Sequence, residues 1–111
     1  MKRLKEFLKA NLYRKIESYE IEMNELKEKQ RNGAEIIDVR SACEYNEGHI
    51  SGAVNIPEYE IDTKFEKIYP NKTGEIVLYC QIGKRSRTAY RKLKRMNYKN
   101  VYCLYVGIDN Y

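Results

Sequence analysis

The sequence contains no long hydrophobic run. Charged side chains interrupt every apolar stretch before it reaches the roughly 18 residues that a membrane-spanning helix needs. The basic N-terminal segment is interrupted in the same way, so it lacks the apolar region of a secretory signal peptide. These absences exclude a membrane span, and they predict a cytoplasmic protein without a membrane partner.

Cysteine is also scarce. Cys43, Cys80 and Cys103 are an odd number and form no C-x-x-C pair, so neither a disulfide framework nor a zinc site is indicated. This usage fits a reducing compartment, and we expect no metal and no organic cofactor. Internal repeats, low-complexity segments and linkers are absent, and 111 residues suffice for one hydrophobic core but not for two.

The positive charge is concentrated in the last third of the chain. Residues 1–75 hold 13 Lys/Arg and 15 Asp/Glu, whereas residues 76–111 hold 8 Lys/Arg and a single acid, Asp109. Such a basic region suits an anionic small substrate or an acidic partner protein. No motif of a nucleic-acid-binding module is present, so we expect no nucleic-acid partner. The plain alternative is a solvated basic helix face.

Short strands alternate with helices along the chain. Residues 35–39 and 75–80 are apolar runs of strand length, as expected of buried parallel strands. Apolar residues at helical spacing predict a helix at 61–68 and another after Ser86. The pattern predicts an α/β fold with a mostly parallel sheet. Further strands are expected at 18–22, 53–56 and 101–106 and a helix at 23–33, in a domain at 17–111 preceded by an N-terminal helical extension, 1–16.

The stretch CQIGKRS, residues 80–86, places a thiol between a strand and a helix. Only the thiolate is nucleophilic, and a free cysteine with a pKa of about 8.5 is mostly protonated at neutral pH. Unpaired N–H groups at the helix start, the helix dipole and the cations Lys84 and Arg85 would lower that pKa. Gly83 lets successive N–H groups turn inward as an anion cradle. The alternative, a small buried hydrophobe at Cys80, requires none of these neighbours.

Two motifs, at residues 36–57 and 80–86, resemble the signatures of the rhodanese-domain sulfurtransferases and follow one another in the order expected of that family. The loop resembles that family's active-site pattern, C-x-x-G-x-R-S/T, and residues 36–57 resemble its other signature, a strand ending in D-V-R followed by E-Y/F, G-H-I, G-A and N-I-P. The resemblance covers about residues 18–111 and implies a rhodanese-like fold, with a central, mostly parallel sheet and helices on both faces. The matching positions are Asp38, Arg40, Glu44, Tyr45, Gly48, His49, Ile50, Gly52, Ala53, Asn55, Ile56, Pro57, Cys80, Gly83, Arg85 and Ser86.

The resemblance implies a sulfur transfer in two steps. Cys80 would take the outer sulfur of thiosulfate, or of a protein or small-molecule persulfide, and pass it to cyanide, a thiol or an acceptor protein. Three charged residues, Asp38, Arg40 and Glu44, are expected to support the loop through charge-assisted hydrogen bonds. The residues expected to line the donor pocket are Gln81, Ile82, Gly83, Lys84, Arg85 and Ser86.

Other functions stay open. Phosphatases and arsenate reductases on the same fold have a C-x5-R loop that clamps an anion of phosphate size, whereas Arg85 gives the shorter C-x4-R. A non-catalytic or redox-sensing binding module would use the basic region to dock an acidic protein. The chain also departs from the family pattern. Gln81 stands where Arg is common, so thiosulfate is expected to bind weakly, and VGIDNY, 106–111, replaces G-G-I-x-x-W.

Three further residues invite a functional interpretation. His49, the single histidine, is expected to be structural because persulfide transfer needs no strong base. Cys43 follows the D-V-R strand and could act as a resolving thiol. Cys103 alternates within VYCLYV and is expected in the core.

Overall fold

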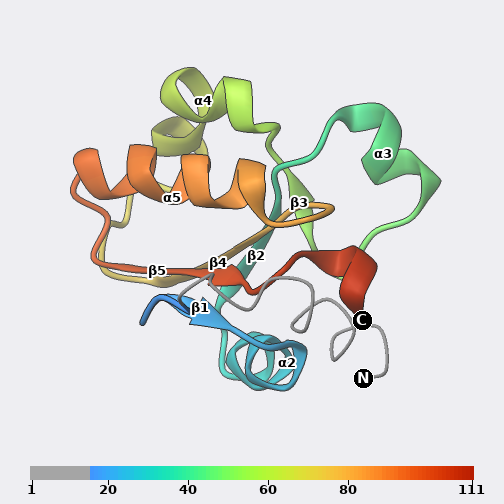
Figure 1. Ribbon diagram of the computed structural model, residues 1–111. Helices are drawn as coiled ribbons and strands as arrows, with labels where there is room; N and C mark the ends of the chain where they lie inside the picture. Colours follow the sequence, from blue (N-terminus) through green and yellow to red (C-terminus); the bar gives the residue numbers. More distant parts are fainter. Residues whose placement is uncertain (1–15) are drawn as a thin grey trace.

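The computed structural model describes residues 16–111, which form a parallel sheet with helices on both faces (Figure 1). The helix expected at 1–16 lies outside these residues, apart from Ile16. The strand order is β1-β5-β4-β2-β3, and each neighbouring pair is parallel, so the predicted α/β class is confirmed. The strands are β1 (Glu20–Ile21), β2 (Glu35–Asp38), β3 (Val54–Asn55), β4 (Glu75–Tyr79) and β5 (Asn100–Leu104).

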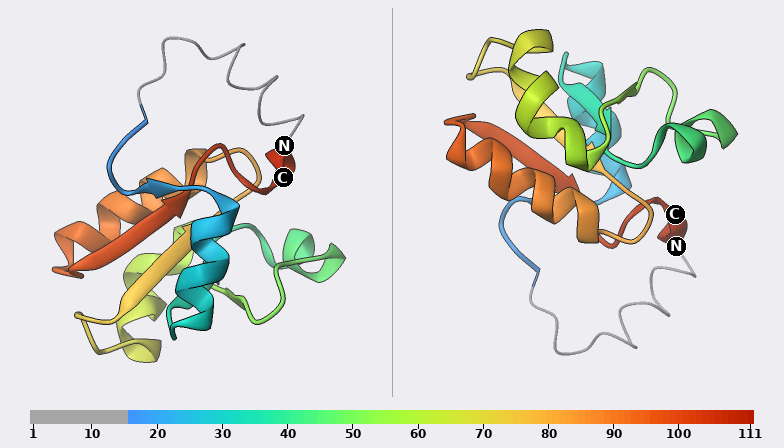
Figure 2. Two further views of the ribbon diagram at one scale, coloured as in Figure 1. Left: turned by 90° about the horizontal axis from the view of Figure 1, so that it is seen from below. Right: turned by 90° about the horizontal axis from the view of Figure 1, so that it is seen from above.

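The helices form one layer on each face of the sheet. Helices α4 (Ile61–Ile68) and α5 (Lys84–Arg95) cover one face and α2 (Met23–Arg31) covers the other (Figures 1 and 2). Parallel strands need such crossovers, because a tight turn cannot return the chain to the same edge of the sheet. The remaining elements are α3 (Ala42–Glu47) and the 3-10 turns η1 (Glu58–Glu60) and η2 (Ile108–Asn110).

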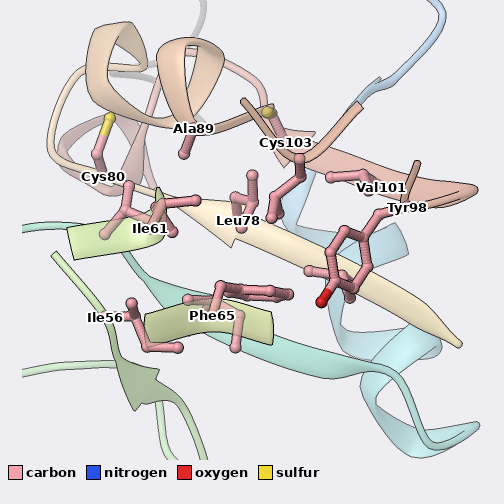
Figure 3. Close-up of a cluster of buried hydrophobic side chains, with 13 residues drawn as sticks. Ile56, Ile61, Phe65, Leu78, Cys80, Ala89, Tyr98, Val101 and Cys103 are labelled. Carbon is pink, nitrogen blue, oxygen red and sulfur yellow. The ribbon is translucent and has the colours of Figure 1, made fainter. Parts of the chain in front are cut away.

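Side chains of the central strands alternate between two hydrophobic clusters. Ile37 and Leu78, which are paired across β2 and β4, pack with Phe65 of α4 and Leu93 of α5 (Figure 3). Ile36, one position earlier, faces the other way, in the cluster that contains Leu26 of α2. This alternation follows from the two-residue repeat of a strand, and it explains why these strands are apolar at almost every position.

Local signals set several element boundaries. Helix α2 ends at Arg31, and Gly33 follows with φ +95°, a conformation in which glycine is favoured. Helix α3 begins with a capping box, in which Ser41 and Glu44 each bond the other's backbone N–H. No helix in the described part of the chain has the length and apolar character that crossing a bilayer requires.

Three expectations about the elements were wrong in detail. Helix α5 begins at Lys84 rather than after Ser86, because Gly83 ends the loop with φ +97° and Ser86 bonds its hydroxyl back to the Gly83 carbonyl at 3.1 Å. The last strand ends at Leu104, since Val106 adopts φ +60° and turns the chain. Ile68, expected on the apolar stripe of α4, is 50% exposed at the end of that helix.

Candidate active site at Cys80

The Cys80 thiol lies where β4 ends and the first turn of α5 begins. Its Sγ accepts hydrogen bonds from the Gly83 N–H at 3.1 Å and the Ser86 N–H at 3.3 Å, and it lies 3.5 Å from the Ser86 Oγ. These N–H groups belong to the helix start, where the helix itself supplies no carbonyl partner. Backbone donors and the positive end of the α5 dipole therefore converge on the sulfur, as expected for an anion cradle.

The same sulfur is covered by protein. Cys80 is fully buried and belongs to the apolar cluster beneath α4 and α5 (Figure 3). A cavity of about 280 Å³ opens elsewhere, between Glu35, Tyr69 and Glu75 at the amino ends of β2 and β4. It lies at the opposite end of the strands from Cys80, so it belongs to a different part of the molecule from the thiol.

The residues expected to line a donor pocket do not all face the thiol. Gly83 and Ser86 contact it directly, whereas the side chain of Ile82 is 49% exposed and Lys84 is also exposed. Gln81 points toward neighbouring segments instead. Its amide oxygen accepts from Arg40 at 3.0 Å, and its amide nitrogen bonds Asp109.

Arg85 forms an ion pair rather than offering a free cation. Its two terminal nitrogens donate to the two oxygens of Glu44 at 2.7 and 2.9 Å, a bidentate pair that joins α5 to α3. Hydrogen bonding to Arg85 lowers the pKa of Glu44 to about 2, and bonds from Ser41 act in the same direction. The first turn of α5 is thereby fixed to the segment that follows β2.

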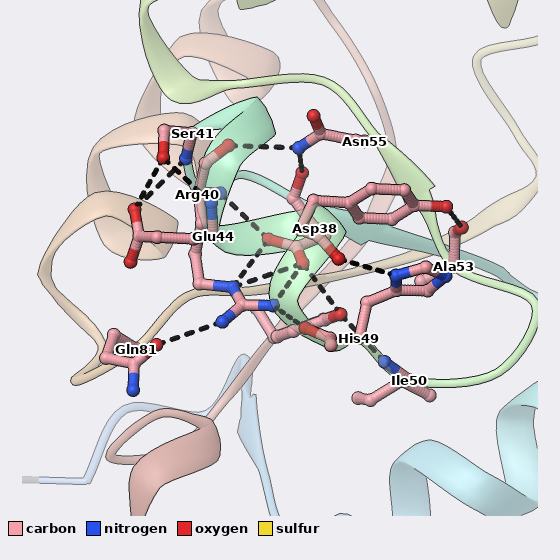
Figure 4. A network of polar contacts seen from close by, with 12 residues as sticks. Asp38, Arg40, Ser41, Glu44, His49, Ile50, Ala53, Asn55 and Gln81 are labelled. Carbon is pink, nitrogen blue, oxygen red and sulfur yellow. Dashed lines mark hydrogen bonds and ion pairs between the residues drawn. The ribbon is translucent and has the colours of Figure 1, made fainter.

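A buried polar network lies beside the loop (Figure 4). The carboxylate of Asp38 accepts from the Arg40 guanidinium, with a shortest distance of 2.7 Å, and from the Tyr79 hydroxyl at 2.9 Å. Arg40 also donates to the Gly48 carbonyl at 2.6 Å. Asp38 is fully buried and Arg40 is 6% exposed, and burial raises the pKa of Tyr79. The network holds Arg40 in the position from which it reaches Gln81.

Reasoning from the sequence missed the contribution of the C-terminal turn. The N–H groups of Ile108 and Asp109 donate to the carbonyls of Cys80 and Gln81 at 2.9 and 3.1 Å. This close approach depends on Gly107, since a Cβ there would lie 2.3 Å from the Gln81 carbonyl oxygen. The only available signal was this glycine within the altered C-terminal family motif.

Arg87 also lies near the loop, although its place in the sequence gave no indication of this. Its guanidinium lies close to the loop. A Cβ placed on Gly83 would be 3.2 Å from an Arg87 terminal nitrogen. No carboxylate among residues 16–111 pairs with Arg87 or with Lys84. The sequence gives no signal that Arg87 lies near the loop, since its spacing does not distinguish it from the other cations of α5.

Two other candidates, Cys43 and His49, lie apart from the cradle. Cys43 is exposed on α3 and approaches Glu47, and His49 is exposed and stacks on Tyr45 at 3.6 Å. Cys103 is fully buried, as expected, and burial raises the pKa of its thiol. Within the described residues, no group of His, Cys, Asp and Glu side chains is arranged to hold a metal ion.

Comparison with known proteins relates this architecture to one family. A family model described as "Rhodanese-like domain" matches residues 22–111. The thiosulfate sulfurtransferase PspE of Escherichia coli is 35% identical over 65 residues, which are 59% of this chain and 62% of that protein. A tRNA uridine(34) hydroxylase of Buchnera aphidicola is 33% identical over 82 residues, 68% of this chain and 26% of that protein.

The fold is similar to that of a solved human protein. The human single-domain sulfurtransferase TSTD1 gives a TM-score of 0.74 at 27% identity, over 85% of this chain and 95% of that one. The match to each of the two curated relatives covers less than two thirds of that relative's length.

Proposed function

Because the chain belongs to the rhodanese-like domain family, we propose that it is a sulfurtransferase that carries sulfane sulfur as a persulfide on Cys80. The observation that carries this proposal is the convergence of the Gly83 and Ser86 N–H groups on the Cys80 sulfur. Donors at this position stabilise a negatively charged sulfur, both as the attacking thiolate and as the persulfide anion. A cysteine with a purely packing role would need neither bond.

Sulfur transfer at Cys80 proceeds without an external oxidant or reductant. The Cys80 thiolate attacks the outer sulfur of the donor, a new S–S bond forms, and the bond between the donor's two sulfurs breaks. The electron pair of that bond leaves with the donor, as sulfite from thiosulfate or as a thiolate from a persulfide. An acceptor thiolate then attacks the outer sulfur of the Cys80 persulfide and regenerates the Cys80 thiolate.

The charges of the loop bear on the choice of donor. The ion pair with Glu44 occupies both terminal nitrogens of Arg85, and Gln81 adds no positive charge. Lys84 and Arg87 remain as partners for an anionic group. Because Arg85 is held by Glu44 and position 81 carries no cation, we expect a persulfide to load Cys80 faster than thiosulfate, whose sulfonate needs cationic partners. The pairing of Arg85 also argues against an arginine clamp on phosphate.

Access to the sulfur requires movement of the covering segments. Cys80 is fully buried, so a donor reaches Sγ only when neighbouring protein groups move aside. The full burial of Cys80 favours one second candidate, a non-catalytic binding module. Alkylation by iodoacetamide at pH 6 separates the two, because an activated thiolate reacts at that pH and an unactivated thiol is sluggish.

The proposal is tested by mass spectrometry after incubation with thiosulfate or with glutathione persulfide. We expect the mass of one sulfur atom to be added at Cys80, and added again after each cycle of removal by a thiol acceptor. Cys80→Ser should abolish the adduct, whereas the matched control Cys43→Ser, which removes the exposed thiol, should leave it unchanged. An adduct found on Cys43 alone, or on no cysteine with either donor, would refute the proposal.

A further inference from the structure

The cations of α5 fall into two groups. Seven of the twelve residues of this helix are Lys or Arg, and none is acidic. Two of them are paired on the flank that faces α3 and η1, where Arg85 binds Glu44 and Lys92 lies 3.3 Å from Glu58 and 3.4 Å from Asp62. The others have no carboxylate partner among residues 16–111; they are Lys84, Arg87, Arg91, Lys94 and Arg95.

Three of the unpaired cations form a row that begins at the active-site loop. Lys84, Arg91 and Arg95 lie seven and four residues apart, so they share the face of α5 opposite the buried stripe of Ala89 and Leu93. All three are exposed, and at 1.5 Å per residue the row is about 16 Å long. Ile82, 49% exposed, adds an apolar side chain at the loop end.

We infer that this surface, the α5 row with Ile82, docks an acidic segment of a protein that exchanges sulfur with Cys80. The inference rests on the proposed function and names the class of partner. A one-sign row of this length attracts an acidic helix or tail and steers its approach, and Ile82 offers the apolar contact typical of a protein interface.

A nucleic acid suits the row less well. Proteins that bind single strands interleave cations with exposed aromatic rings on which bases stack. The α5 row of Lys84, Arg91 and Arg95 carries no aromatic side chain. Tyr90, beside this row, is already stacked on Tyr19, with the ring centroids 3.6 Å apart. A protein thiol is also the group that the Cys80 persulfide can modify directly. The thiolate of the partner attacks the outer sulfur of the Cys80 persulfide, and a new S–S bond forms. The S–S bond of the Cys80 persulfide breaks, and its electron pair stays on the Cys80 sulfur.

The test measures sulfur transfer from persulfidated full-length chain to two short synthetic peptides. One is rich in Glu and Asp and ends in cysteine, and the other replaces each acid with Gln or Asn. We expect the acidic peptide to accept sulfur about tenfold faster at low salt, and the difference to disappear as salt rises from about 0.05 M to about 0.5 M. Arg91→Glu combined with Arg95→Glu should abolish the preference.

A matched variant controls for net charge. Lys27→Glu combined with Arg31→Glu makes the same charge change at the same spacing on α2, across the sheet, where both residues are exposed. It should keep the preference. Loading of Cys80 by glutathione persulfide at about 0.15 M salt should be unchanged in both variants, because Arg91 and Arg95 lie beyond the Debye length of about 8 Å from the helix start.

The outcomes separate the two proposals. If Cys80 accepts no sulfur from any small donor, the proposed function fails. If Cys80 loads normally but the rate of sulfur transfer does not depend on the charge of the peptide, the docking inference is overturned while the proposed function stands. The same holds if both double variants lose the preference equally. Tighter binding of single-stranded polyuridine than of the acidic peptide, lost in the α5 variant, would replace the protein partner with a nucleic acid.

Discussion

Two buried cysteines in one cluster have opposite hydrogen bonding. Both Cys80 and Cys103 are fully buried. The Cys103 thiol donates to the Ser86 carbonyl at 3.3 Å, which stabilises the protonated form, and burial raises its pKa. The Cys80 sulfur instead accepts from two backbone N–H groups, which stabilise the thiolate. Burial alone therefore does not decide whether a thiol in this core is reactive.

Ser86→Ala tests the contribution of a single hydroxyl. The Ser86 Oγ lies 3.5 Å from the Cys80 sulfur and can turn to donate to it when the thiolate forms. We expect its loss to slow persulfide formation at neutral pH by about tenfold, the equivalent of about 1.4 kcal/mol. The control is Thr88→Ala, which removes an exposed hydroxyl of the same helix. A Ser86→Ala rate identical to that of the parent would contradict this role.

Glu44→Gln tests the ion pair between α3 and α5 through its pH dependence. The pKa of Glu44 in the folded chain, about 2, lies below the ordinary value of 4.5, so its stabilising effect is complete above pH 4.5 and is lost as pH falls toward 2. Because the pair is partly exposed, we expect the variant to lose about 1 kcal/mol of unfolding free energy at neutral pH. Urea unfolding at a series of pH values should show that loss shrinking between pH 4.5 and 2.

A matched exposed pair provides the control for this measurement. Glu66 lies 3.5 Å from Lys72, and its side chain is 55% exposed. Glu66→Gln should change the unfolding free energy little at any pH, because exposed pairs contribute little. A Glu44→Gln difference that stays constant down to pH 2 would mean that the carboxylate does not stabilise the fold through its charge.

Two elements hold the segment that carries the thiol: the start of α5 and the C-terminal turn. The first supplies N–H groups to the sulfur, and the second supplies N–H groups to the carbonyls of Cys80 and Gln81. The turn places Val106 at φ +60°, an uncommon conformation for a β-branched residue, and Gly107 at φ +77°. Buried contacts of Val106 with Tyr105 and Tyr111 oppose the cost of this backbone conformation.

Gly107→Ala tests whether the turn must approach the loop this closely. A Cβ would lie 2.3 Å from the Gln81 carbonyl oxygen and would also disfavour the positive φ. We expect the variant to lose about 2–4 kcal/mol of unfolding free energy and to transfer sulfur more slowly, because the loop must shift. The control is Gly74→Ala, where the nearest atom lies at 3.8 Å and the change should stay within about 0.5 kcal/mol. Equal stability of the two variants would contradict the contact.

In the whole molecule, the strand order unites segments that are distant in sequence. Strands β2 and β4 are neighbours and parallel, so the residues that follow Asp38 and Tyr79 emerge at one edge of the sheet. This brings Arg40 within 3.0 Å of Gln81 and Glu44 within 2.7 Å of Arg85, although each pair is separated by 41 residues. The position of the site is therefore a property of the topology.

Leu78→Ala tests how far the site depends on the shared core. Leu78 is fully buried in β4 and belongs to the same cluster as Cys80. We expect a loss of about 3–4 kcal/mol of unfolding free energy in denaturant titrations, with transfer activity largely kept under conditions where the chain stays folded. Ile68→Ala, at a half-exposed position of α4, should cost less than about 1 kcal/mol. Equal losses would mean that the cluster is not the main source of stability.

Much of the fold was predictable from local patterns. The apolar runs at residues 35–39 and 75–80 and the helical spacing at 61–68 correspond to β2, β4 and α4. The start of α5 was predicted too late, because serine is common at helix starts. In the structure Ser86 lies within the first turn of α5, where its hydroxyl bonds the Gly83 carbonyl. Of the candidate site, the cradle and a supporting role for Glu44 were expected, whereas Arg85 as the partner of Glu44 and the approach of Gly107 were not.

The sequence by itself determined the alternation of strands and helices and the thiol at the end of one strand, because these depend on side-chain periodicity and on residues adjacent in the chain. Only the tertiary structure decided which cations of α5 have a carboxylate partner within residues 16–111. Arg85 and Lys92 are paired by acids from α3, η1 and α4, while Lys84, Arg91 and Arg95 are not. Charge pairing depends on distances of a few ångströms between segments far apart in sequence, and only the packed fold sets those distances.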